Sequence, residues 1–456
     1  MRLASSDGGA MPRRTPSSEV VTIRREQGDD SGSWSPVIGD NTEQLGDTLK
    51  SSGALDLAEF KRVRTESLQI LQYCLRPTGE PGRRTGLIIG YVQSGKTLSM
   101  TTVAALARDN KFRLFVVLAG TKKNLVEQSK SRFARELRGG GTHLRWEMWN
   151  NPTEGEYRQD LEVLVDEWKD ARIPEEDQRA LFITVMKQHT HLQNLTELLE
   201  AVRLEGITAL VFDDEADQAG LNTQPDEDLP STTYRRILRL RELLSRHTYL
   251  QYTATPQAPL LINLLDILSP DFSEVIEPGK SYTGGRTFFI DRTNLVRAIP
   301  PHDAPDARED AVEPPPSLLG ALRVYFLGVA AAHVENRSGF RSMLIHPSIR
   351  RASHSQFTSW VHAIKQRWRT ELAPPEGKSD AARDAEIVEF KKAYDDLKAT
   401  AQDIPAFKDL LRPLWTIIGR TVVTEVNSQT GREVDWSRGA WHILVGGAKL
   451  ERGFTV

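Results

Sequence analysis

The fold is decided by residues 86–97, which read Gly86-Leu87-Ile88-Ile89-Gly90-Tyr91-Val92-Gln93-Ser94-Gly95-Lys96-Thr97. An apolar strand runs into a G-x-x-x-x-G-K-T loop, and a helix is expected over 98–107. Backbone N–H groups of such a loop and the helix N-terminus bind phosphates. Lys96 is expected to contact the β- and γ-phosphates and Thr97 to ligate Mg²⁺. We therefore expect ATP to be held by Gly90, Gln93, Ser94, Gly95, Lys96 and Thr97.

Apolar runs alternate with helical patterns on both sides of this loop. Strands are expected at 87–89, 114–118, 181–185, 210–212 and 249–252, and later at 343–345, 421–426 and 442–445. Short continuous apolar runs are typical of buried parallel strands. Their alternation with helices, such as those expected over 54–75 and 318–334, predicts an α/β fold with parallel sheets.

The chain of 456 residues is too long for a single core, so at least two domains are expected. We expect a disordered N-terminal tail over 1–50, a first lobe over 51–299 with an insertion near 139–178, and a second lobe over 317–456 with a helical insertion near 355–412. Six prolines between 300 and 316 predict a stiff, extended linker.

Composition excludes several classes of protein. The net charge of −3 gives no global basic bias, so any nucleic-acid surface has to be local. Cys74 is the single cysteine, which rules out an internal disulfide and favours a reducing compartment. No apolar run approaches ~20 residues and no secretory signal is evident, so we expect a cytoplasmic protein without a membrane contact.

A second motif supplies the acids that ATP hydrolysis needs. The strand at 210–212 ends in Asp213-Asp214-Glu215-Ala216-Asp217, at the strand end where open α/β sheets bind ligands. Asp214 is expected to hold Mg²⁺ and Glu215 to orient or deprotonate the attacking water. Asp217 is expected to contact the next motif, Thr253-Ala254-Thr255, which directly follows the strand at 249–252.

This motif order resembles that of superfamily-two helicases, and the blocks are similar to those of the Z-one domain family, helicase-like P-loop ATPases often labelled as endonucleases. The similarity covers 60–456 and includes 118–121, 124–125, 128–129, 213–219, 252–256, 342–346 and 446–455. Two positions depart from the family pattern, Gln257 and Ala448. The family continues beyond the Arg452-Gly453-Phe454-Thr455 block, so the resemblance implies a second lobe that is incomplete at its C-terminus and weak hydrolysis by this chain alone.

The resemblance implies two RecA-like lobes with ATP bound between them. It implies that Thr253 and Thr255 couple the ATP state to lobe movement, and that Arg452 and Gly453 close on the nucleotide or the nucleic acid. Thr121, Lys122 and Lys123 are implied to contact the sugar–phosphate backbone, although a solvated face is an equally good interpretation of the two lysines.

Other candidate sites are weaker. Glu389-Phe390-Lys391 is a Glu-x-Lys pair in a helical stretch, and His189 and His191 have no third metal ligand nearby. His346 is expected to pack or to lie at the lobe interface. Trp146, Trp149 and Trp168 are expected on a partly buried surface rather than stacked on bases.

Three functions remain open on the sequence. The first is an ATP- and Mg²⁺-dependent motor on nucleic acid, with DNA the expected class and bacterial defence the expected setting. The second is a nucleotide-gated switch that assembles partner proteins without unwinding. The third is the ATPase part of an endonuclease, with a nuclease or defence-system protein as partner.

Overall fold

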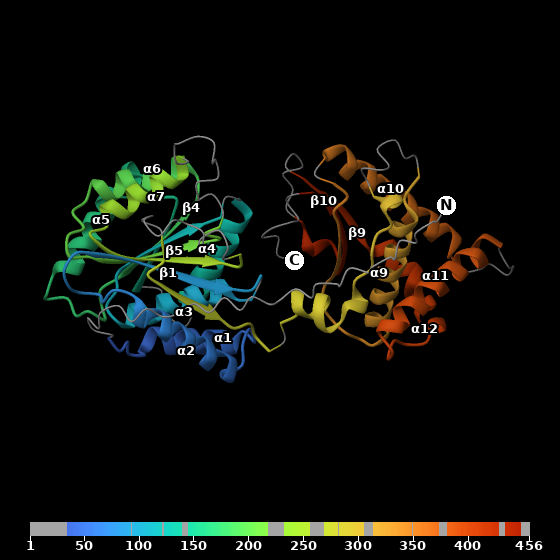
Figure 1. The fold of residues 1–456 in the computed structure, drawn as a ribbon, viewed down its shortest axis with the longest axis horizontal. Helices are drawn as coiled ribbons and strands as arrows, with labels where there is room; N and C mark the ends of the chain where they lie inside the picture. Colours follow the sequence, from blue (N-terminus) through green and yellow to red (C-terminus); the bar gives the residue numbers. More distant parts are fainter. Residues whose placement is uncertain are drawn as a thin grey trace, which may run out of the picture.

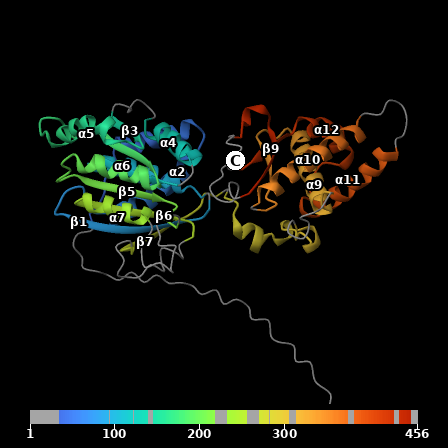
Figure 2. The same cartoon turned by 90° about the horizontal axis from the view of Figure 1, so that it is seen from above.

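The computed structural model describes residues 34–92, 94–120, 123–138, 145–217, 232–255, 269–280, 282–304, 313–348, 350–373, 381–427 and 434–447. Two lobes, each with its own sheet, are joined by a connector that comes after the last strand of the first sheet (Figures 1 and 2).

The first lobe is built on a seven-stranded sheet in which every neighbouring pair is parallel. The order across the sheet is β3-β4-β2-β5-β6-β1-β7. The strands are β1 (Gly82–Gly90), β2 (Leu114–Ala119), β3 (Trp146–Asn150), β4 (Ala180–Met186), β5 (Thr208–Asp214), β6 (Arg246–Thr253) and β7 (Phe272–Ile276). The five strands predicted for this lobe are confirmed.

Helices cover both faces of this sheet (Figure 1). On β2, Phe115 and Val117 face one core while Leu114 and Val116 face the other, as the two-residue period of a strand requires. The first core is closed by α1 (Asp40–Ser51), α2 (Leu57–Tyr73), α3 (Lys96–Asp109) and α4 (Lys123–Leu137), and the second by α5 (Glu154–Lys169), α6 (His189–Glu200) and α7 (Thr232–Leu243).

The predicted tail over 1–50 is wrong for residues 34–50. Helix α1 packs Leu45 and Leu49 into the first core. The carboxylate of Asp109, at the far end of α3, accepts backbone N–H bonds from Gly39, at 2.9 Å, and Thr42, at 3.1 Å. It therefore serves as the N-cap acceptor that the segment itself lacks. Residues 1–33 lie outside the described part of the chain.

The expected insertion near 139–178 is also wrong in its larger part. β3 pairs with β4 and forms one edge of the sheet, and α5 packs Leu161 and Leu164 into the second core. The other edge, β7, was not predicted. Both are short edge strands with polar residues in them, so neither shows the continuous apolar run of the central strands.

The second lobe has a three-stranded parallel sheet in the order β8-β10-β9. Its strands are β8 (Arg341–Ile345), β9 (Val422–Val426) and β10 (Trp441–Gly446), as predicted. Its helices all lie on the side of the sheet away from the first lobe (Figures 1 and 2). They are α9 (Pro316–Val334), α10 (Arg351–Glu371), α11 (Ala381–Thr400) and α12 (Phe407–Arg420).

The region near 355–412 is therefore not an insertion as a whole. Helix α10 packs directly on β9 and β10, and α12 buries Leu414 and Ile417 in the same core.

Among the described residues, one helix, α9, is long and apolar enough to cross a membrane. Half of it is buried inside the lobe, with Leu322 and Phe326 in the core.

The predicted linker over 300–316 is partly folded onto the second lobe. Residues 301–303 form a 3-10 turn, and the buried carboxylate of Asp303 accepts the backbone N–H of Ser317 at 2.9 Å, at the start of α9. Earlier in the connector, Arg297 Nε donates to Asp396 of α11 at 2.8 Å and Arg292 donates to the carbonyl of Thr400 at 3.2 Å. Residues 305–312 lie outside the described chain.

Candidate functional site

The three sequence motifs of the first lobe come directly after three adjacent strands. The order β5-β6-β1 places the acids after β5, the Thr-Ala-Thr segment at the end of β6 and the P-loop after β1 side by side. The register pairs Asp214 with Tyr252 and Thr253 with Ile89. Because the strands are parallel, all three motifs lie at the C-terminal ends of the strands, on the same side of the sheet. This is where such folds bind ligands.

Two glycines shape the P-loop for close approach. Gly95 has φ +102° at the N-cap of α3, a left-handed conformation that side chains rarely adopt. A Cβ on Gly90 would lie 2.9 Å from Ile276 and 3.0 Å from Lys96. Among the described residues, the buried hydroxyl of Ser94 has no hydrogen-bond partner, as expected of a group that would bind a ligand. Gln93 lies outside the described residues.

Lys96 and the acids after β5 interact electrostatically. Burial lowers the pKa of the Lys96 ammonium, and Asp214, Glu215 and Asp217 oppose that shift. The ammonium donates to the carbonyl of Tyr91 at 3.2 Å. Burial, and then the charge of Glu215, raise the pKa of Asp214 to about 6, while Lys187 and Lys96 pull it down. Two lysines, Lys96 and Lys187, thus face four carboxylates, those of Asp213, Asp214, Glu215 and Asp217, which leaves an excess of negative charge at the site.

The donor set suits Mg²⁺. Magnesium prefers oxygen ligands and is usually held by one or two carboxylates plus phosphate oxygens and water. Thr97, in the first turn of α3, and Asp214, at the end of β5, supply hydroxyl and carboxylate oxygens of this kind. A divalent cation would also offset the negative charge of Glu215, which adds to burial in raising the pKa of Asp214.

Asp217 is joined to both threonines of the next motif. Its two carboxylate oxygens accept hydrogen bonds from Thr253 Oγ1 at 2.9 Å and Thr255 Oγ1 at 2.7 Å. The backbone N–H of Thr255 donates to Thr253 Oγ1 at 3.0 Å. The contact expected between the acidic motif and the Thr-Ala-Thr segment is therefore present in the structure.

Several predicted residues cannot be placed. Thr121, Lys122, Arg452 and Gly453 lie outside the described residues, and Lys123 is described only as the backbone start of α4. One functional candidate, Lys187, was not predicted from the sequence; its ammonium lies 2.8 Å from Asp213. A lysine directly at the end of the apolar strand β4 is the signal that could have identified it.

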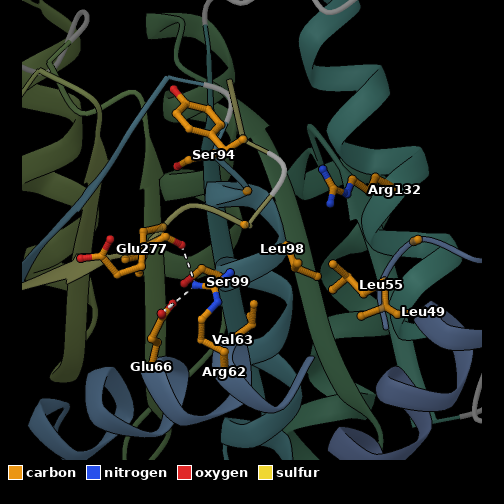
Figure 3. Close-up of a pocket in the computed structure, with 15 residues that line it drawn as sticks. Leu49, Leu55, Arg62, Val63, Glu66, Ser94, Leu98, Ser99, Arg132 and Glu277 are labelled. Atoms are coloured by element: carbon orange, nitrogen blue, oxygen red, sulfur yellow. Dashed lines mark hydrogen bonds and ion pairs between the residues drawn. The ribbon is translucent and has the colours of Figure 1, made fainter. Parts of the chain in front are cut away.

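A cavity of 280 Å³ opens beside the P-loop at Ser94 and Gly95. Its apolar wall includes Leu55, Val63 and Leu98. Figure 3 shows Arg62 between Glu66 and Glu277 on one side of the cavity, and Arg132 on the other. Arg62 donates to Glu66 at 2.7 Å and to the carbonyl of Glu277 at 2.6 Å.

The connector between the lobes also contacts the P-loop, because the Tyr282 hydroxyl donates to the carbonyl of Val92 at 2.7 Å.

The weaker candidates behave as structural residues. Trp146 and Trp149 are core residues, and Trp168 donates its indole N–H to the carbonyl of Arg179 at 2.7 Å. Burial raises the pKa of the Cys74 thiol to about 12, which makes it a poor nucleophile. Glu389 lies on α11 and pairs with Lys392 at 2.5 Å. Within the described ranges, no cluster of three or more His, Cys, Asp or Glu is arranged to hold a metal.

The fold and the site define a helicase-like P-loop nucleotide-binding protein. Comparison with family models agrees: residues 58–258 match the type III restriction enzyme, res subunit, and residues 317–456 match the Z1 domain. These two matches confirm the resemblance drawn from the motifs, and the chain combines a helicase-like first lobe with a Z1-domain second lobe. The search of curated proteins finds no match.

Solved helicase structures are similar at low identity. The Hef helicase domain of Pyrococcus furiosus is 14% identical, with 85% of this chain and 86% of that chain covered and a TM-score of 0.36. The helicase MrfA is 13% identical, with 89% and 51% covered and a TM-score of 0.41. The DEAD-box helicase Mss116, bound to ssRNA and UDP-BeF, is 12% identical, with 88% and 66% covered and a TM-score of 0.38. At these scores the likenesses define neither a ligand nor an activity for this chain.

Proposed function

We propose that this protein is a cytoplasmic ATP hydrolase of the helicase type, a motor that couples hydrolysis of Mg²⁺–ATP to closure of its two lobes on a nucleic-acid strand. The proposal rests mainly on one observation. Lys96 interacts electrostatically with Asp214, Glu215 and Asp217 at the C-terminal ends of neighbouring strands. Lys96 would bind the terminal phosphates, Thr97 and Asp214 would hold Mg²⁺, and Glu215 would orient the attacking water.

The Asp217 contacts support coupling between ATP and the motor cycle. Thr253 and Thr255 share one carboxylate that lies two residues beyond Glu215, so a shift of Glu215 or Asp214 is transmitted directly to the end of β6. Arg452 and Gly453 would complete the site from the second lobe, and Thr121, Lys122 and Lys123 would grip the backbone of the strand. Because the first lobe resembles a restriction-enzyme subunit, we place the motor on DNA, in bacterial defence, with a nuclease as a candidate partner.

The test is ATP turnover by this chain with and without single-stranded DNA, duplex DNA and RNA. Removing one preorganised charge contact costs about 100- to 1,000-fold in turnover, so Lys96→Ala should abolish the activity. Lys391→Ala removes an exposed lysine from α11 of the second lobe and should leave turnover within twofold. If Lys96→Ala retains turnover within a few-fold of wild type, the proposal is wrong.

The cavity beside the P-loop would take the nucleotide base. Its volume of 280 Å³ is near the lower end of ligand pockets, which suits one heterocycle rather than a whole nucleotide. Filling it with Val63→Trp should weaken ADP binding about tenfold or more, since even one methylene in a hydrophobic pocket contributes about 1–3 kcal/mol and a base is larger than that. Binding of inorganic tripolyphosphate should not change, and calorimetry with both ligands checks this. Equal losses for the two ligands would place the base elsewhere.

The alternative function is a nucleotide-gated switch that assembles partner proteins. The Asp217 hydrogen bonds would serve lobe movement in such a switch without nucleic acid. The salt dependence of nucleic-acid affinity distinguishes the motor from the switch. A motor that neutralises several phosphates on a single strand loses affinity with a log–log slope of about 0.7 per phosphate. A filter-binding titration with a flat response would favour the switch.

A further inference from the structure

A buried lysine that no sequence motif identifies lies behind the acidic turn. Lys187 comes directly after β4, and its backbone N–H donates to the carbonyl of Ala119 at the end of β2 at 3.0 Å. Its side chain is fully buried. From there the ammonium reaches past the end of β2 to the residues that end β5.

Three oxygens of the acidic motif accept hydrogen bonds from the ammonium of Lys187. It lies 2.8 Å from Asp213 Oδ1, 2.6 Å from the carbonyl of Asp214 and 2.8 Å from the carbonyl of Glu215. A lysine ammonium carries three protons, so three acceptors use its full donor capacity. Two of these acceptors are backbone oxygens, and Lys187 therefore holds the main chain of the turn.

Asp213 is fixed from its other side by Tyr249 of β6. The Tyr249 hydroxyl donates to Asp213 Oδ2 at 2.6 Å, and the guanidinium of Arg241 lies 4.8 Å from the centre of the Tyr249 ring. Strands β4, β5 and β6 thus all contribute to one buried polar network. A network whose members are satisfied is rigid, because moving one group leaves others unpaired.

The turn that this network holds has an uncommon backbone. Glu215 has φ +56°, a left-handed conformation that few residues other than glycine adopt. Its carbonyl accepts from Lys187, and the next backbone N–H, of Ala216, donates to the carbonyl of Tyr252 at 3.0 Å. The turn is therefore clamped on both sides, and the conformation at Glu215 determines where its carboxylate points.

We propose that Lys187 is a positioning residue for the proposed ATPase: together with Asp213 it holds the Asp214–Glu215 turn in the geometry that binds Mg²⁺ and orients water. This inference rests on the proposed function and deepens it. Lys187 acts through the turn and does not itself touch the nucleotide. Its loss should therefore affect the metal and the catalytic step more than the binding of the nucleotide.

The test uses the full chain with the double substitution Lys187→Met and Asp213→Asn. Lys187→Met alone leaves a carboxylate buried without its ion pair and is expected to destabilise the fold. In the double variant both charges are absent, and an asparagine oxygen can still accept from Tyr249. The matched control is Arg323→Met with Glu386→Gln, which removes a buried ion pair of 2.8 Å from the second lobe.

Two readouts separate positioning from a purely structural role. We expect kcat of the double variant to fall about 100-fold, the usual effect of misplacing a catalytic group by about 1 Å, with KM for ATP within threefold. In the ADP complex we expect Mn²⁺ affinity, measured by electron paramagnetic resonance, to fall about tenfold or more, as for other groups that orient metal ligands. The control should change neither readout by more than threefold.

A folded double variant with wild-type kcat and wild-type Mn²⁺ affinity would overturn the inference. If the wild-type chain binds Mn²⁺ and ADP but does not turn over ATP, the proposed motor function fails, and the Mn²⁺ comparison still decides the role of Lys187. If Lys96→Ala abolishes turnover and the double variant does not reduce it, the motor function stands and the role proposed for Lys187 is wrong.

Discussion

The two lobes are built from the same kind of parallel sheet but differ in the residues at the ends of their strands. In the first lobe, β5, β6 and β1 end in acids, threonines and the P-loop; the acids and threonines are hydrogen-bonded, and Lys96 of the P-loop interacts electrostatically with the acids. In the described part of the second lobe, the strand ends carry His346, Glu425 and Gly446, and Glu425 accepts from Ser355 at 3.0 Å. The same architecture thus holds different local chemistry, so function has to be argued from the site and not from the sheet.

The largest effect is expected from breaking the core of the second lobe alone. Arg323 lies 5.3 Å from the centre of the Trp368 ring and pairs with Glu386, so Arg323→Met leaves this buried carboxylate with only the more distant Arg367, 3.8 Å away, and should cost up to about 3–5 kcal/mol. A urea titration should show an earlier transition for this lobe, while the first lobe still binds ADP. The exposed pair of Arg337 with Glu335 is the control, and Arg337→Met should cost at most about 1 kcal/mol. Loss of ADP binding in step with that transition would show that the lobes do not fold independently.

A smaller effect should come from the contacts that connect two strands of the first lobe. Thr253→Val with Thr255→Val keeps the shape of both side chains but removes two hydrogen bonds to the Asp217 carboxylate. Each such bond contributes about 1.5–3 kcal/mol, so DNA stimulation of ATP turnover should fall about tenfold or more. The affinity for ADP, measured by calorimetry, should stay within threefold. Unchanged stimulation would mean that this network does not transmit the nucleotide state.

The smallest effect is a pH dependence confined to the first lobe. Because the pKa of Asp214 is raised to about 6, Mg²⁺ affinity should be constant above pH 6 and fall about tenfold per pH unit below it. The folded protein holds this proton more tightly than the unfolded chain, so the stabilisation is complete below about pH 4 and is lost as pH rises through 6. Asp214→Asn should therefore raise the melting temperature above pH 6 but not below pH 4. A Mg²⁺ affinity that is flat from pH 5 to 8 would contradict this assignment.

The sequence predicted the parts of the first lobe whose signals are local. The P-loop, the acidic motif and the central strands each appear as a continuous run of residues, and the parallel order of β5, β6 and β1 then brings them together. The second-lobe strands were predicted for the same reason. Motif order could also be matched to known families, as the two family models confirm.

The missed features depend on contacts between distant residues. Helix α1 is capped by Asp109, which no local pattern near residue 40 reveals. Lys187 contacts the acidic turn from a strand that is not even adjacent to β5, since β2 lies between them. Sequence patterns show where a strand lies along the chain but not which strands pack beside it. These contacts depend on that packing.

The connector is fastened at both ends, and this limits how the lobes can move. Tyr282 ties its beginning to the P-loop carbonyl of Val92, while Arg292 and Arg297 tie its later part to α11. With these bonds intact, rotation of one lobe against the other would be concentrated in residues 283–291, of which Thr287–Asp291 form a short π-helix. That stretch contains Gly284 and Gly285, the residue type with the widest backbone freedom. The end of this stretch nearer the first lobe is therefore tied to the phosphate-binding loop through Tyr282.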